Sequence, residues 1–230
     1  SILHYNKNTI PEIKKFLEEK NVEIRKNFAV DKIKATKERK NISIIDYGLG
    51  NLQSVAKAFE KIGRIVKIIS TPEEVINAEN LVLPGVGAFE DGIKGLQDRG
   101  LVEPIRKHVK LNKPILGICL GMQLLLSESE EFGIHEGLNL IKGKVIKFNK
   151  ENLETDDRIP HIGWNSIHFK NKGGILNGIH EYSEMYFVHS FFPLLENKKE
   201  ILATTHYCGQ EFCSLIKKDN IYGCQFHPEK

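Results

Sequence analysis

The sequence lacks the features that mark membrane-spanning and secreted proteins. The apolar run from Pro114 to Leu126 ("PILGICLGMQLLL") is interrupted by glycines and falls well short of the ~20 residues that cross a bilayer. The first residues, "SILHYNKN", contain no charged start followed by an apolar core, which is the pattern of a secretory signal. Neither a membrane partner nor export is therefore expected.

Cysteine is scarce, and neither sign of charge dominates. The chain of 230 residues has four cysteines, and a chain of that length and apolar content needs no disulfides, which favours a reduced, cytoplasmic setting. The formal net charge is only +3, and the basic excess sits in the first 40 residues. No basic face with interleaved aromatic residues appears in the main domain, so nucleic acid is not an expected partner.

Two short segments precede the main domain. Residues 9–20 are predicted to form a helix, because Thr9 to Glu12 ("TIPE") matches a capping box and apolar residues then follow at helical spacing. Residues 26–40 are charged and show no steady period, so they are predicted to be a linker. The main domain then begins at residue 41.

The main domain begins with apolar strands that alternate with helices. Strands are predicted at 42–47, 65–70, 80–85 and 114–119, and helices at 51–62, 73–77, 88–97 and 101–110. Uninterrupted apolar strands indicate burial on both faces, so the sequence predicts an α/β fold with a mostly parallel central sheet flanked by helices. Further strands are expected at 140–148, 161–169, 185–193, 201–207, 212–218 and 221–226, as antiparallel or mixed additions to that sheet.

Cys119 lies between Gly117 and Gly121 at the point where the fourth strand gives way to a helix. The frame G-x-C-x-G resembles a nucleophile elbow, in which a sharp turn needs small neighbours and lifts the nucleophile out of the sheet. The helix N-terminus favours a thiolate there, and the N–H of Leu120 would point toward an oxyanion. The alternative is an inert buried cysteine.

His227 and Glu229 supply a candidate base and its orienting group. They stand two positions apart in "HPEK", directly after the last apolar strand, and such residues project to the same side of an extended chain. His227 would take the thiol proton while Glu229 fixes the imidazole tautomer, as in a catalytic triad. The alternative is a surface histidine beside an ion-paired glutamate.

The turn "LPGVGAF" ends the third strand, and Val86 or Gly87 there would offer a second backbone N–H to the oxyanion. Two other patterns are weaker. The spacings among His206, Cys208, Cys213, Cys224 and His227 do not match structural zinc sites, so no metal is expected. The stretch "YGLGNLQS" lacks the third glycine of a dinucleotide-binding loop.

The motifs "GICLGMQ", "LPGVGAF" and "HPEK" resemble class I glutamine amidotransferases, and "DYGLGNLQSV", "PHIGWN" and "YFVHSFF" are similar to the glutaminase subunits of imidazole glycerol phosphate synthases. The resemblance covers residues 41–230 and implies a flavodoxin-like fold. It also implies that glutamine is hydrolysed to glutamate and ammonia without a cofactor, and that the ammonia passes to a cyclase for histidine biosynthesis.

The resemblance further implies roles for single residues. Cys119, His227 and Glu229 would form the catalytic triad. Glutamine would be held by Gln123 and by the segment His189, Ser190 and Phe191. The cyclase would be contacted by Asn51, Trp164 and Lys230.

Residues 1–25 resemble the last strand and helix of a (β/α)8 cyclase, so the parent chain is expected to carry the cyclase first and the glutaminase second. Residues 41–230 would lack the last helix of the glutaminase family. Two alternative functions remain at this point. One is a glutaminase that supplies another acceptor, such as a nucleotide sugar, and the other is a non-catalytic module that binds the synthase.

Overall fold

The computed structural model describes residues 41–149, 158–171 and 174–230. Contacts divide the chain into two compact units, Ser1–Lys37 and Glu38–Lys230. The tail-like segment 1–25, the helix expected at 9–20 and the linker expected at 26–40 lie outside the described residues.

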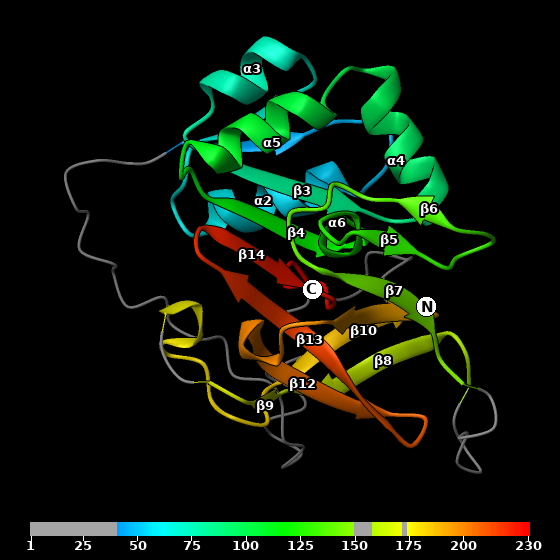
Figure 1. The fold of residues 1–230 in the computed structure, drawn as a ribbon. Helices are drawn as coiled ribbons and strands as arrows, with labels where there is room; N and C mark the ends of the chain where they lie inside the picture. The colour runs from blue at the N-terminus through cyan, green and yellow to red at the C-terminus, as the bar shows by residue number, and fades with distance from the viewer. Residues whose placement is uncertain (1–40, 150–157, 172–173) are drawn as a thin grey trace, which may run out of the picture. The chain divides into compact units, whose positions relative to one another are not determined.

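An eight-stranded sheet runs through the Glu38–Lys230 unit (Figure 1). In spatial order its strands are β2 (Val66–Ile69), β1 (Ile42–Ile45), β3 (Asn80–Gly85), β4 (Ile115–Cys119), β14 (Ile221–Cys224), β13 (Gln210–Lys218), β12 (Ile201–Tyr207) and β9 (His168–Phe169). The strands from β2 to β14 are parallel, and those from β14 to β9 are antiparallel. The order β2-β1-β3-β4 is that of flavodoxin-like sheets, so the predicted fold class is confirmed.

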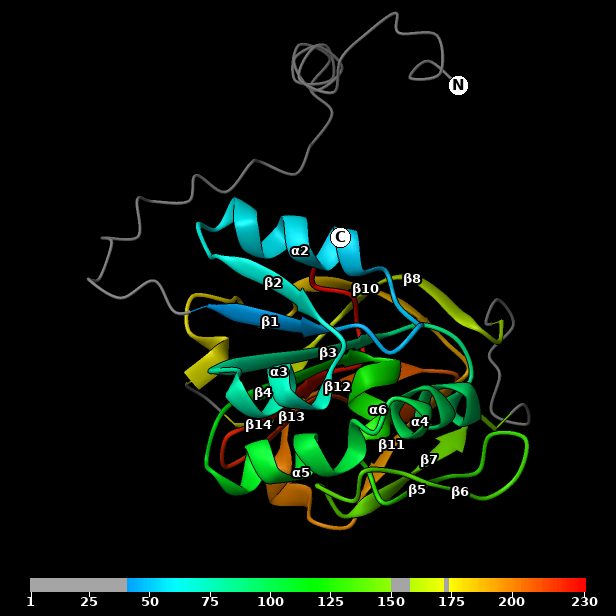
Figure 2. The ribbon, with the colours of Figure 1, turned by 90° about the horizontal axis from the view of Figure 1, so that it is seen from above.

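Helices cover both faces of the parallel part of the sheet. In Figure 2, α2 (Leu52–Lys61) lies on one side of the strands. The other side carries α3 (Pro72–Asn77), α4 (Phe89–Asp98), α5 (Val102–Lys110) and α6 (Leu120–Leu124). Polar side chains cap two of these helices at their N-termini: Asn51 caps α2, and Thr71 with Glu74 forms a capping box at α3.

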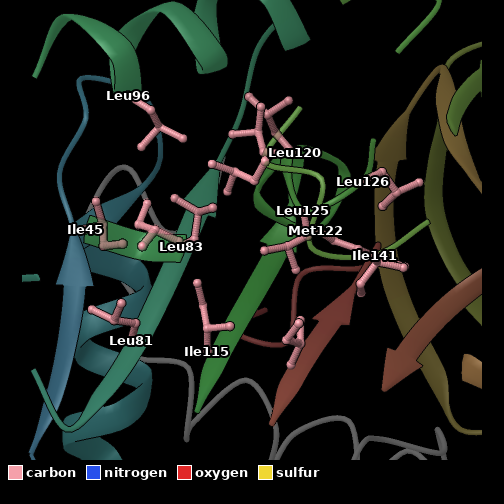
Figure 3. Close-up of a cluster of buried hydrophobic side chains, with 14 of the residues drawn as sticks. Ile45, Leu81, Leu83, Leu96, Ile115, Leu120, Met122, Leu125, Leu126 and Ile141 are labelled. Atoms are coloured by element: carbon pink, nitrogen blue, oxygen red, sulfur yellow. The ribbon is translucent and has the colours of Figure 1, made fainter. Parts of the chain in front are cut away.

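Each central strand contributes side chains to two separate hydrophobic clusters, which is why the sequence of each strand is an uninterrupted apolar run. Ile45 and Leu83 belong to the cluster under α3, α4 and α5, shown in Figure 3. Their neighbours Ile44 and Val82 belong to the second cluster, which includes residues of α2. Successive side chains of a strand point to opposite faces, so a strand buried on both sides must be apolar throughout.

The second half adds two smaller sheets. One pairs β8 (His161–Ser166) with β10 (Glu184–His189), and the other has the order β11 (Phe191–Leu195), β7 (Gly143–Lys147), β5 (Glu128–Ser129) and β6 (His135–Glu136). Short 3₁₀ turns occur at η3 (Gly174–Leu176) and η4 (Lys198–Glu200). Of the strands expected to extend the main sheet, only β9, β12, β13 and β14 do so.

Two segments expected as single strands are each divided. Ile167 separates β8 from β9, and Ser190 separates β10 from β11. In both cases the two halves pair with different partners, so the chain crosses from one sheet to another at the break. None of the helices in the described ranges is long and apolar enough to span a membrane.

Candidate active site

Three neighbouring parallel strands bring the candidate residues together. Gly85 at the end of β3 is level with Cys119 at the end of β4, and Cys224 at the end of β14 is level with Ile118. His227 follows β14 by three residues. The carboxyl ends of parallel strands meet at one edge of a sheet, where flavodoxin-like folds bind their ligands. The glycine-rich turn, the thiol and the imidazole therefore share this edge.

Cys119 adopts the strained backbone expected of an elbow, with φ 53° and ψ −110°. A side chain at Gly121 would place its Cβ 1.7 Å from the Leu83 carbonyl oxygen, and one at Gly117 would lie 2.6 Å from the Gly121 carbonyl oxygen. Neither contact is possible, because real Cβ atoms essentially never approach closer than 3.0 Å. The two glycines let β4 turn into α6 at the cysteine.

The Cys119 thiol is buried but not isolated, with 6% of the residue exposed. Gln225 Nε2 donates to its sulfur at 3.6 Å, and the Val188 carbonyl oxygen lies 4.0 Å away. Sequence reasoning missed Gln225. It stands two positions before His227, so the alternation that linked His227 with Glu229 also identifies it.

His227 and Glu229 form a buried pair. His227 Nδ1 donates to Glu229 Oε1 at 2.9 Å, and the two side chains are 6% and 3% exposed. Nε2 of His227 has no partner that meets hydrogen-bond geometry among the described residues. The Cys119 thiol is nevertheless close enough to act on it electrostatically.

The pKa values of this pair move in opposite directions. Burial alone lowers the pKa of His227, but Cys119 and Glu229 outweigh it and raise the pKa to about 10. Burial raises the pKa of Glu229, yet its bond to His227 brings the net pKa below the usual value. The site therefore favours an imidazolium beside a carboxylate and a sulfur.

A cleft of about 220 Å³ opens beside the thiol. Its lining includes all three residues predicted for the oxyanion site, Val86, Gly87 and Leu120, together with Cys119. Gly87 has φ 111°, which a residue with a side chain rarely adopts. The residues predicted for the oxyanion site therefore lie beside the same cleft as the sulfur.

The four residues predicted to hold glutamine line the same cleft. Gln123 Nε2 donates to the Phe191 carbonyl at 2.9 Å and to Gln225 Oε1 at 3.1 Å, so the side-chain nitrogen of Gln123 is hydrogen-bonded within the protein. The ring of His189 is also engaged, with Nδ1 2.8 Å from the Phe191 carbonyl and Nε2 3.3 Å from His161. Both nitrogens of His189 therefore have protein partners, and the ring itself is not free to bind a ligand.

Sequence reasoning missed Glu131, which also lines the cleft. Its Oε2 accepts a hydrogen bond from the Phe89 N–H at the start of α4, at 2.8 Å. Burial raises the pKa of Glu131 despite that bond. The residue follows β5 in a loop, where no periodic pattern points to it.

The residues predicted for the partner interface lie outside this cleft, and all three are exposed. Asn51 caps α2, and Lys230 follows the triad segment. Trp164 is 49% exposed, and its ring lies 5.7 Å from that of Tyr186. Within the described ranges, no group of three or more histidine, cysteine or acidic side chains is placed to hold a metal.

Comparison with known proteins agrees with this geometry. The family model described as "Glutamine amidotransferase class-I" matches residues 43–230, and the chain belongs to that family. The solved structure of PurLQS from Thermotoga maritima has a TM-score of 0.65 at 17% identity, covering 84% of this chain and 89% of that one, which supports the fold alone.

More similar relatives define the branch of the family. Subunit HisH 1 of imidazole glycerol phosphate synthase from Legionella pneumophila (strain Paris) is 51% identical over 196 residues, which is 83% of this chain and 92% of the relative. HisH from Geobacter sulfurreducens is 46% identical over 191 residues, 82% of this chain and 91% of the relative. Within the class I amidotransferases, the chain belongs with the HisH subunits.

Proposed function

We propose that Cys119, His227 and Glu229 carry out the glutamine hydrolysis that feeds imidazole glycerol phosphate synthase. The protein is a glutaminase of histidine biosynthesis, with glutamine as its substrate and the cyclase of the synthase as its partner. One observation carries the assignment of the triad. Cys119 ends β4 and lines the cleft, the buried His227–Glu229 pair follows the adjacent parallel strand β14, and Cys119 is close enough to His227 to raise its pKa.

The chemistry follows from the positions of these groups. The Cys119 sulfur attacks the side-chain amide carbon of glutamine, and the carbonyl oxygen becomes an oxyanion that accepts from the N–H of Leu120 and from Val86 or Gly87. His227 donates its proton to the leaving nitrogen, and ammonia departs. Water, deprotonated by His227, then attacks the thioester and releases glutamate, which regenerates the thiol.

The cleft suits a small zwitterionic substrate. Its volume of about 220 Å³ lies below the ~300 Å³ at which pockets for drug-sized ligands begin. Glu131 brings a carboxylate to the cleft, which matches the α-ammonium group of a free amino acid. Gln123, Ser190 and Phe191 line the rest of the cleft and are proposed to complete the contacts with glutamine.

The partner surface is proposed to lie where β8 and β10 expose apolar side chains. Ile162, Trp164 and Val188 are 59%, 49% and 38% exposed. Asn51 and Lys230 are also exposed, at the ends of other elements. Large apolar side chains on an otherwise polar surface favour contact with another protein.

We also propose a cellular location for the protein and an organisation for its parent chain. The four cysteines are free thiols, which fits a reducing cytoplasm. The resemblance of residues 1–25 to the end of a cyclase supports a parent chain in which both activities are joined, with the linker raising their effective concentration. The full reading frame of the gene tests that proposal.

Labelling with a glutamine-like electrophile tests the assignment of the triad. The full chain is incubated with the reagent in the presence of the synthase partner, and the modified peptide is mapped by mass spectrometry. Modification at Cys119 alone, prevented by excess glutamine, is the expected result. A chain that is folded and partner-bound but remains unmodified would be a binding module instead.

A further inference from the structure

Two buried histidines, His161 and His189, pair with each other, and only His189 reaches the lining of the cleft. His161 begins β8 and His189 ends β10, and the antiparallel register places them directly opposite each other. They are 2% and 7% exposed, with His161 Nδ1 3.3 Å from His189 Nε2. The ring of His161 is stacked between Phe187 at 4.8 Å and Tyr207 at 3.8 Å.

The Phe191 carbonyl determines which nitrogen donates and which accepts in each hydrogen bond of this histidine pair. The Phe191 carbonyl only accepts, so His189 Nδ1 carries the hydrogen and His189 Nε2 is the acceptor. His161 Nδ1 must then donate to His189, which leaves His161 Nε2 to accept from Asn165 Nδ2 at 3.4 Å. Burial, and after it the neighbouring His161, lowers the pKa of His189 to about 3, so the ring stays neutral as this order requires.

The same carbonyl connects the pair to the reaction centre. Phe191 accepts a second hydrogen bond from Gln123, which also donates to Gln225, and Gln225 donates to the Cys119 sulfur. A buried polar chain therefore runs from β8 to the nucleophile. We define the relay as Asn165, His161, His189, the Phe191 carbonyl, Gln123 and Gln225.

We propose that His161 is a positioning residue for glutamine: through His189 it fixes the Phe191 carbonyl and hence the segment 188–191 that forms one wall of the cleft. Ser190, within this wall, interrupts the chain between two different sheets, so neither sheet alone fixes its backbone. The relay supplies the missing constraint. This inference rests on the proposed function, because it assigns the wall to glutamine binding.

Removing one member of such a pair differs from removing both. A lone His161→Phe change keeps the aromatic stack but leaves the buried Nε2 of His189 without its donor, which destabilises the site. His161→Phe combined with His189→Phe replaces both polar partners by apolar rings, so that neither position retains a buried polar atom without its partner. The double variant therefore recovers stability while the link to Phe191 stays broken.

The test compares these two variants with Phe212→Leu in the full chain, with the synthase partner present. Phe212 packs against both histidines, at 5.9 Å and 5.1 Å between ring centres, but donates no side-chain hydrogen bond, so its truncation perturbs packing alone. Both histidine variants are expected to raise KM for glutamine about tenfold, with kcat changed less than about threefold. Phe212→Leu is expected to lower the melting temperature and leave KM unchanged.

A second measurement distinguishes an effect on the wall of the cleft from a loss of the fold. The rate at which a small alkylating agent modifies Cys119 reports the thiol alone, whereas a glutamine-like electrophile also needs the wall. In the histidine variants only the second rate is expected to fall, by about tenfold. Equal loss of both rates, an unchanged KM in His161→Phe, or a KM that recovers in the double variant overturns the inference. A wild-type chain that hydrolyses no glutamine refutes the proposed function instead.

Discussion

His227 and His189 are both at most 7% exposed, yet their surroundings drive them to opposite charge states. The pKa of His227 is raised to about 10, and that of His189 is lowered to about 3. Burial disfavours the charged form of both. The difference comes from the partners. A carboxylate and a sulfur outweigh burial at His227, whereas at His189 a second imidazole adds to the effect of burial and the hydrogen bond to the Phe191 carbonyl does not offset it.

The two regions also lie next to each other. The backbone N–H of His227 donates to the carbonyl of Tyr186, in the strand that ends with His189. Exposure to solvent therefore does not distinguish the two histidines. The different partner groups fit the two proposed roles, in which His227 moves protons and His189 holds the backbone, and each change below alters one side of this comparison.

Replacing the nucleophile gives the largest expected effect. Cys119→Ala should lower glutamine hydrolysis at least about 10⁴-fold, measured as glutamate release, while synthesis from added ammonia with the partner continues. It should also lower the pKa of His227, followed by NMR, because the sulfur is one of the two groups that raise it. Cys213→Ala is the matched control, a buried cysteine outside the cleft. Loss of both activities in a folded Cys119→Ala variant would contradict this division.

Removing the carboxylate should have the next largest effect. Glu229→Gln leaves His227 without its charged orienting group, so kcat is expected to fall about 10²- to 10³-fold, with the pKa of His227 moving toward its ordinary value. Glu211→Gln removes another carboxylate whose pKa is lowered, by its pairing with Lys170 at the surface, and it should leave kcat unchanged. A Glu229→Gln enzyme with wild-type kcat would exclude Glu229 from the triad.

The opposite pKa shifts predict opposite effects of pH on stability. The raised pKa of His227 stabilises the fold fully below about pH 6.5, and this contribution is lost as the pH rises toward about 10. The lowered pKa of His189 stabilises the fold above about pH 6.5, and this contribution is lost as the pH falls toward about 3.

Denaturant titrations from pH 4 to pH 6.5 isolate the His189 contribution. The groups whose charge acts on this ring are His161 and His227. In the His161→Phe, His189→Phe double variant the slope of unfolding free energy against pH should be shallower than in the wild type by up to about 1.4 kcal/mol per pH unit for each proton no longer taken up. Carboxylates elsewhere titrate alike in both proteins, so equal slopes would show that His189 is not held neutral.

Removing a helix cap outside the cleft has the smallest expected effect and serves as the reference for the histidine variants. Thr71→Ala removes the side-chain oxygen that caps α3 and is expected to lower the free energy of unfolding by about 1 kcal/mol. KM, kcat and the pH slopes should stay as in the wild type. A shift in KM would mean that the cleft responds to global stability, which would weaken the interpretation of the histidine variants.

Local sequence patterns predicted the parts of the site that depend on neighbours in the chain. The G-x-C-x-G frame identified the elbow because two glycines beside a cysteine have a steric cause. The spacing of His227 and Glu229 identified their pairing because alternate residues of an extended segment share a side. The order of apolar strands and helices likewise predicted the parallel sheet.

The parts that were missed depend on register between distant segments. His161 meets His189 only because β8 and β10 pair with that one alignment, which nothing in "PHIGWN" or "YFVHSFF" specifies. Glu131 reaches the cleft from a loop. Residues 185–193 are divided at Ser190 because the two halves pair in different sheets, and local strand propensity does not predict that pairing. The contacts proposed for Asn51, Trp164 and Lys230 stay predictions.

The place of β14 beside β4 has a consequence during synthesis on the ribosome. A further 227 − 119 = 108 residues must be translated after the nucleophile before its base exists, which takes roughly 5–20 s at cellular rates. The last of the described strands then has to enter between β4 and β13, in the middle of the sheet. With Cys119 and His227 in their proposed roles, the nascent chain carries a thiol without its base while these 108 residues are translated, and glutamine hydrolysis awaits the insertion of this central strand.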